Sequence, residues 1–141
     1  MEDSKTAGKR IMRQLLGDAY VEDAERKIAS GAFGVFPAEH SVEACFGTIW
    51  ARGELDLKSR SIATISMVMA LRDTYGLKNH LRAGLRLGIT PQQLAEIAYQ
   101  AIPYLGYPVA GIALRTIHEV LAEEGLVPEP QPAAPDQGAQ R

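Results

Sequence analysis

Apolar residues recur at the three- and four-residue spacing of α-helices along most of this chain, and no segment shows the sustained alternation of a β-strand. The pattern predicts helices at residues 5–16, 20–30, 38–50, 57–75, 77–87, 91–102 and 109–124. The stretch Thr90-Pro91-Gln92-Gln93 has the residue types of a helix start with a capping box. We therefore predict an all-α fold, a compact bundle of about six to seven helices.

The length of 141 residues fits one domain with its own hydrophobic core. We expect this domain to span residues 1–127. Residues 128–141 are rich in Pro, Ala and Gln and have no apolar periodicity, which predicts a disordered tail.

The charge and composition narrow the classes of partner. A formal net charge of −2 argues against a general binder of nucleic acid or of anionic membranes, since such proteins usually carry a basic excess. No apolar run is long enough to span a membrane, and the N-terminal residues lack the hydrophobic region of a signal peptide. With Cys45 as its one cysteine, the chain cannot form an intramolecular disulfide, as suits a reducing compartment. We expect a cytoplasmic protein.

The segment 57–75 is apolar on every side of its helical wheel. Such a helix is expected to be buried all round. In so small a protein, this predicts either a central position in the bundle or a place in an interface between copies of the chain.

His80 is the side chain on which the functional interpretation depends. On the wheel of residues 76–87 it lies opposite the polar arc formed by Lys78, Asn79, Arg82 and Arg86. Its neighbours include Gly76, Ala83 and Gly84, whose small size leaves room for a ligand or for another helix backbone. A buried histidine bonded to a carbonyl or a carboxylate is the simpler interpretation, and a catalytic histidine is the alternative.

The other reactive side chains form no motif. His40, His80 and His118 do not pair at helical spacing and Cys45 has no close partner, so we predict no metal site. Cys45 is either a small buried hydrophobe or the nucleophile of a pair with His80. Arg60 precedes the apolar segment, so its guanidinium is expected to be partly buried beside an anion.

Four segments, in order and spacing, resemble the carboxymuconolactone decarboxylase family of the alkyl hydroperoxidase D-like superfamily. They are LGDAYVEDA (16–24), FGTIWARGELDLKSRSIATISMVMAL (46–71), HLRAGLRLGITPQQLAEI (80–97) and YLGYPVAGIAL (104–114). The resemblance covers about residues 8–125. It implies a compact all-α subunit that assembles into a ring, a homotrimer or a homohexamer. The peroxidase branch of the superfamily has a CxxC pair that this chain lacks, so disulfide-based peroxidase activity is not expected.

The resemblance also implies a reaction. Members of the decarboxylase branch act, without a cofactor, on a carboxylated butenolide (4-carboxymuconolactone) in aromatic-compound catabolism through the β-ketoadipate pathway. His80 matches the family's histidine and is the expected catalytic residue, as proton donor or enolate partner. Arg52 and Arg60 are the expected clamps for a substrate carboxylate, and Trp50 and Tyr104 are expected to bind the substrate.

One position departs from the family's pattern. The family often has Glu four residues before this histidine, where this chain has Gly76. A backbone carbonyl, Glu43 or another subunit would then orient His80. Three functions stay open: decarboxylation of a small cyclic carboxylate, related enol or lactone chemistry on another intermediate (isomerisation, ring opening or cyclisation), and a non-catalytic ring that binds a small molecule.

Overall fold

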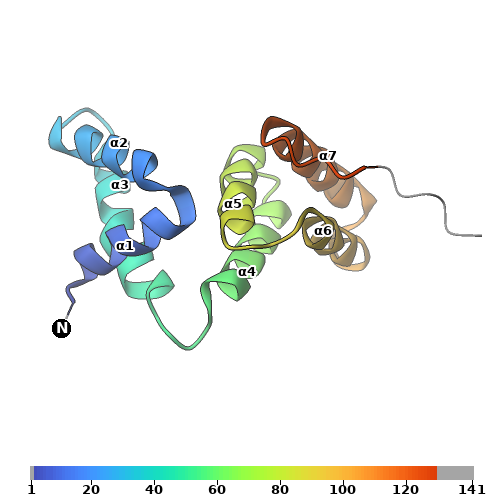
Figure 1. The fold of residues 1–141 in the computed structure, drawn as a ribbon, viewed down its shortest axis with the longest axis horizontal. Coiled ribbons are helices and arrows are strands. Elements are labelled where there is room, and N and C mark those ends of the chain that lie inside the picture. Colours follow the sequence, from blue (N-terminus) through green and yellow to red (C-terminus); the bar gives the residue numbers. More distant parts are fainter. Residues whose placement is uncertain (1, 130–141) are drawn as a thin grey trace, which may run out of the picture.

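The described part of the chain, residues 2–129, contains only helices and their connections in the computed structural model (Figure 1). The elements are α1 (Ser4–Leu16), α2 (Asp18–Ala29), α3 (Phe36–Ser41), the π-helix η1 (Val42–Trp50), α4 (Leu57–Ala70), α5 (Thr74–Arg86), α6 (Pro91–Leu105) and α7 (Tyr107–Glu123). The all-α prediction is confirmed. The predicted tail at 128–141 lies outside the described residues, apart from Pro128 and Glu129.

Two groups of helices make up the fold (Figure 1). The larger core lies among α4, α5, α6 and α7, and its fully buried side chains include Ile65, Leu81 and Leu94. A second cluster joins α1 and η1 to α5 through Ile11, Leu15, Trp50 and Ala83. Trp50 therefore lies at the junction of the two groups, at the end of η1.

Two glycines bring α1 and η1 into backbone contact. A Cβ atom on Gly8 would overlap the carbonyl oxygen of Val42, and a Cβ atom on Gly47 would overlap the carbonyl oxygen of Ser4. The sequence pattern predicted one helix over residues 38–50, whereas the structure has an α-helical turn followed by a π-helix. The π-helical segment η1 is the part that lies against α1. The irregular helix geometry therefore occurs where the chain packs on a helix that is distant in sequence.

The apolar helix α4 is buried on one face only. Ser61, Ile65 and Met69 are buried, whereas Ile62, Met67 and Leu71 near its other faces are exposed. The expectation that this helix is buried on every side is therefore wrong for a single copy of the chain.

The helices α4 and α5 meet at a sharp turn that the sequence pattern did not predict. α4 ends at Ala70 rather than near residue 75, and Arg72 adopts a left-handed backbone conformation with φ of 57°. Asp73 then caps α5, because its carboxylate accepts a hydrogen bond from the N–H of Gly76. Five residues assigned to the end of one predicted helix, residues 71–75, thus form the turn and the start of the next.

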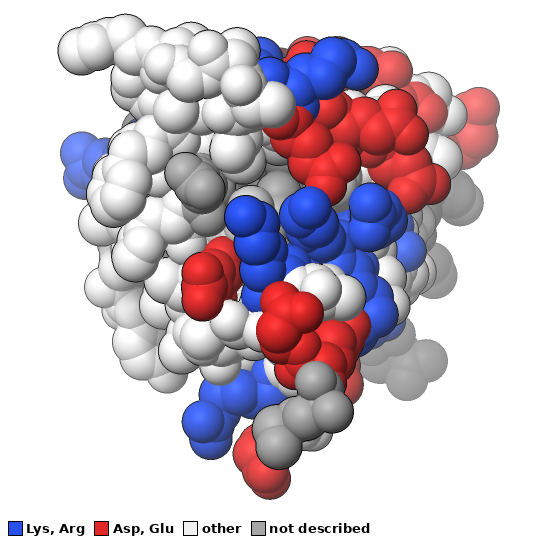
Figure 2. Space-filling model, turned by 90° about the vertical axis from the view of Figure 1, so that its left-hand side faces the viewer, with Lys and Arg blue, Asp and Glu red and all other residues white. Residues whose placement is uncertain are grey.

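Ion pairs at the surface link neighbouring helices. Lys9 lies 2.6 Å from Glu25, which joins α1 to α2, and Lys78 lies 2.9 Å from Glu119, which joins α5 to α7. Figure 2 shows basic side chains next to acidic ones on the face that it draws, rather than a patch of one sign. Within the described residues, no helix has both the length and the apolar character needed to cross a membrane.

Candidate active site around His80

His80 lies in the middle of α5, half-buried, with its ring stacked on Trp50. The two ring centroids are 6.5 Å apart and the ring planes differ by 8°. Trp50 is 7% exposed and is held by the cluster that joins α1, η1 and α5. The indole thus gives the imidazole a fixed, apolar wall, and the inward orientation predicted for His80 is observed.

The surroundings of His80 change its protonation. Burial lowers the pKa of the His80 imidazole, because the charged form loses hydration, and the negative charge of Asp73 opposes this effect in part. A lowered pKa makes the imidazolium a stronger acid while reducing its population at neutral pH. The His80 imidazolium can therefore act as a proton donor from a partly desolvated position.

Arg60 is held by the loop that follows Trp50. Its Nε donates to the carbonyl oxygen of Leu55 at 3.1 Å, and its Nη2 donates to the carbonyl oxygen of Arg52 at 3.1 Å. These partners are backbone carbonyl oxygens rather than the anion that we expected beside this side chain. A guanidinium has five N–H donors, so this anchoring leaves donors for a carboxylate. Arg52 itself is exposed on the loop.

Tyr104 lies away from this cluster. It is 77% exposed and lines a groove between α4 and α6, with a volume of about 600 Å³, together with Met67, Ile97 and Gln100. Of the five predicted site residues, the structure joins Trp50 to His80 by stacking and Arg60 to the backbone of Arg52. It puts Tyr104 in a separate groove.

The room predicted beside His80 is occupied in the folded chain. A Cβ atom on Gly84 would meet the side chains of Ile89 and Ile65, at 3.0 and 3.2 Å. A Cβ atom on Gly76 would overlap Oδ2 of Asp73. Side chains of the same subunit therefore fill the space beside these glycines, and the glycines do not line an internal ligand cavity.

Two other predicted neighbours of His80 are placed by the structure. Glu43, a candidate for orienting the imidazole, accepts a hydrogen bond of 3.0 Å from Ser4 Oγ. Cys45 is exposed on η1, and partial desolvation raises the pKa of its thiol, whereas a cysteine nucleophile requires a lowered pKa. The second finding argues against a Cys45–His80 nucleophilic pair.

Asp73 is the residue near the site that the sequence interpretation missed. Its charge acts on His80, and its carboxylate lies over Gly76. The pattern Asp73-Thr74-Tyr75-Gly76, an N-cap residue three positions before the backbone N–H that it binds, was the signal that could have revealed it.

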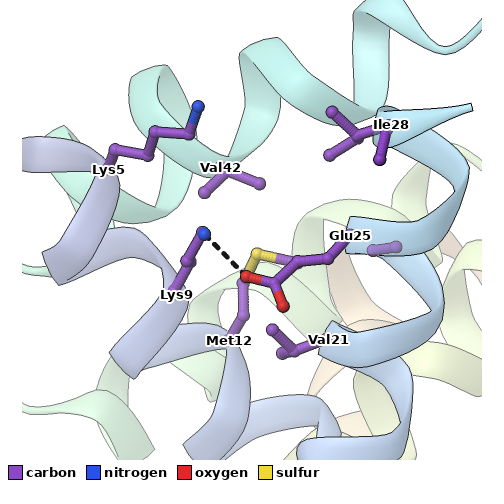
Figure 3. Close-up of a pocket in the computed structure, with 9 residues that line it drawn as sticks. Lys5, Lys9, Met12, Val21, Glu25, Ile28 and Val42 are labelled. Atoms are coloured by element: carbon purple, nitrogen blue, oxygen red, sulfur yellow. Dashed lines mark ion pairs between the residues drawn. The ribbon is translucent and has the colours of Figure 1, made fainter. Parts of the chain in front are cut away.

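A cavity in the N-terminal group of helices contains none of the predicted site residues (Figure 3). It encloses about 190 Å³ between α1, α2 and η1, and Met12, Val21, Ile28 and Val42 provide apolar walls. The Lys9–Glu25 ion pair is also part of its lining (Figure 3). Within the described residues, no three His, Cys, Asp or Glu side chains are grouped as ligands for a metal ion.

Comparison with known proteins places the His80 region inside a segment that a family model matches. The sequence model of the carboxymuconolactone decarboxylase family matches residues 38–119, which include His80 and the other four predicted site residues. The chain is 33% identical over 84 residues to 4-carboxymuconolactone decarboxylase of Acinetobacter baylyi, which covers 60% of this chain and 63% of that protein. It is 31% identical over 101 residues to nitrosuccinic acid decarboxylase of Metarhizium robertsii, which covers 72% of this chain and 69% of that protein. The chain thus spans slightly less than two thirds of the Acinetobacter relative.

Proposed function

Since the chain belongs to the carboxymuconolactone decarboxylase family, we propose that it is a carboxy-lyase that releases CO₂ from a small carboxylate, with His80 as the catalytic residue. The observation that carries this proposal is the half-buried imidazole of His80 stacked on Trp50, inside the matched region. Both relatives described above are named decarboxylases, which supports the reaction class. The substrate that we propose first is a carboxylated butenolide such as 4-carboxymuconolactone, as part of aromatic-compound catabolism.

The chemistry of such a substrate needs no cofactor. The bond between carbon and the carboxylate breaks, CO₂ leaves, and the electron pair delocalises through the ring double bond onto the lactone carbonyl. The resulting enolate then takes a proton on carbon, so one proton is consumed for each CO₂ released. A positioned acid and a hydrogen-bond donor to the enolate oxygen are the groups that lower the barrier.

We assign the proton donation to His80 and the binding of carboxylate to the arginines. The imidazolium of His80 transfers its proton to carbon and is reprotonated by water, while Trp50 fixes the plane of the ring. Arg60, which the loop carbonyls hold in place, and exposed Arg52 provide the positive charge that a second carboxylate of the substrate requires.

The fungal relative favours a second class of substrate. A nitrosuccinate loses CO₂ next to a nitro group, so the electron pair passes to nitro oxygen atoms instead of a lactone carbonyl. Both substrates therefore share an electron-withdrawing group conjugated to the carbon that loses CO₂. The Gly76 departure from the family's pattern supports a substrate that differs from that of the Acinetobacter relative.

The decarboxylase proposal is tested by incubating the chain with 4-carboxymuconolactone and with nitrosuccinate, while CO₂ and ultraviolet absorbance are both recorded. We expect CO₂ release from one of the two. A change in absorbance without CO₂ would replace decarboxylation with isomerisation, ring opening or cyclisation. A thermal shift with neither signal would favour the non-catalytic binding ring. Heat-denatured protein gives the background rate of spontaneous decarboxylation.

We further propose that the chain functions as a homo-oligomeric ring. The groove between α4 and α6 carries exposed apolar side chains, including Met67, Tyr104 and Leu105, which a second copy of the chain would cover. In such a ring, Tyr104 of one subunit would contact substrate bound by a neighbouring subunit. Light scattering after size-exclusion chromatography is expected to give the mass of a trimer or a hexamer, and a monomer mass would refute the ring.

A further inference from the structure

The first turn of α5 holds the Asp73 carboxylate close to Gly76. Asp73 Oδ1 accepts a hydrogen bond of 2.9 Å from the N–H of Gly76. A Cβ atom on Gly76 would overlap Oδ2 of Asp73 and would lie 3.0 Å from its Cγ and 3.3 Å from Val68 Cγ1. The Asp73 carboxylate therefore occupies the space in which a side chain at position 76 would begin.

Asp73 and His80 share one face of α5. They are separated by seven residues, which is about two helical turns, so they differ by only about 20° around the helix axis. A helical side chain leans toward the N-terminus, which directs the imidazole of His80 back toward Asp73. Gly76 lies between them on this face and has no side chain to separate the two groups.

The charged groups on the surrounding elements are engaged elsewhere. On the opposite face of α5, Lys78 pairs with Glu119 and Glu123 of α7, and Arg82 pairs with Glu123 and Glu124. On α4, Arg60 donates to the carbonyls of the loop before it. On α1, Arg13 pairs with Asp18 of α2. Asp73 is the charged residue whose field acts on His80.

We propose that Asp73 is a positioning residue for His80, whose carboxylate stabilises the protonated imidazole through its charge across the open position at Gly76. The role of this pair in turnover rests on the decarboxylase function proposed above, whereas the coupling between the two groups does not. An aspartate at a helix N-cap thereby does two things at once: it caps α5, and it offsets part of the loss of protonated imidazole that burial causes.

The coupling is tested by following the imidazole resonances of His80 through a pH titration by nuclear magnetic resonance, without any substrate. Asp73→Asn removes the charge but keeps a side chain that caps helices well, so α5 is expected to stay folded. We expect the midpoint of the His80 titration to move to lower pH in this variant. Asp73→Ser, a second uncharged cap, is expected to move it in the same direction.

A matched control is available in the chain itself. Asp56 caps α4 in the same way, with Oδ1 accepting from the N–H of Ser59 at 3.0 Å, and it is not among the groups that affect His80. Asp56→Asn is therefore expected to leave the His80 midpoint in place. An unchanged midpoint in Asp73→Asn, or an equal shift in both asparagine variants, would overturn the proposal.

The titration tests the coupling between Asp73 and His80, and the substrate assay tests the decarboxylase proposal. Either result can be negative without the other. If Asp73→Asn lowers the midpoint of the His80 titration, but neither 4-carboxymuconolactone nor nitrosuccinate releases CO₂, the coupling holds and the decarboxylase proposal fails. If CO₂ is released but the midpoint does not move, His80 acts without Asp73. When both hold, the pH profile of turnover in Asp73→Asn is expected to move to lower pH in step with the titration, an effect that a purely structural cap would not produce.

Discussion

Replacing His80 with Asn is expected to reduce the rate of CO₂ release by about 10²- to 10⁴-fold, the range typical of losing a general acid. Asparagine keeps a polar side chain of similar size beside Trp50 but cannot carry a proton to carbon. Because His80 is half-buried rather than part of the fully buried core, the fold is expected to survive, and circular dichroism checks this. Progress curves of wild type and variant at equal concentration give the ratio of rates.

The dependence of turnover on pH provides a second test of His80 as the acid. If the imidazolium is the acid, turnover is highest below the pKa of His80 and falls as the pH rises through it. Burial holds that pKa below the ordinary value for histidine, so the decline is expected to begin on the acidic side of that value. His118, exposed on α7, supplies the matched control, and His118→Asn is expected to keep both rate and profile. Full activity in His80→Asn would remove His80 from the mechanism.

Replacing Gly47 with Ala is expected to lower the free energy of unfolding by about 2 to 5 kcal/mol. The added Cβ atom would overlap the carbonyl oxygen of Ser4 and would lie 2.7 Å from the Ser4 carbonyl carbon. These are backbone atoms of α1, which cannot rotate away as a side chain would, so α1 must move off η1. Gly8→Ala meets the carbonyl of Val42 in the same way and is expected to have a similar effect.

Gly111 provides the comparison for this prediction. It lies within α7, and no atom outside its own stretch of the helix is within 4 Å of the position that its Cβ atom would take. Gly111→Ala is expected to leave stability unchanged or raise it by up to about 1 kcal/mol, because alanine favours the helix. Urea unfolding of the variants measures all three changes. Equal stability of Gly47→Ala and wild type would mean that α1 and η1 do not approach as closely as the structure shows.

The helical content and several helix starts were predictable because they depend on residues a few positions apart. Thr90 and Gln93 form the predicted capping box, in which each side chain bonds to the other's backbone N–H. α4 starts at Leu57 as predicted, and Asp56 caps it by accepting from the N–H of Ser59. The family resemblance, carried by short segments in order, was also readable from the sequence and was confirmed by the match over residues 38–119.

The helix ends were less predictable where packing outweighed local preference. The predicted helix at 91–102 stops before Pro103, yet α6 continues through this proline to Leu105, and the chain turns only at Gly106, with φ of 83°. The missing N–H of a proline removes one hydrogen bond near the end of the helix, and the contacts of α6 with α7 maintain the last turn. The end of α4 was missed because apolar residues continue up to Leu71 and no glycine or proline follows them directly.

By itself, the sequence determined an all-α chain, the family and the inward-facing histidine, since these follow from periodicity, caps and motifs along the chain. The tertiary structure decided what surrounds that histidine. Trp50 reaches His80 across 30 positions because α1, η1 and α5 share one apolar cluster. Asp73 reaches the same face because α4 stops early and α5 begins with this residue as its cap. Contacts of this kind depend on how helices end and pack, which no local pattern specifies.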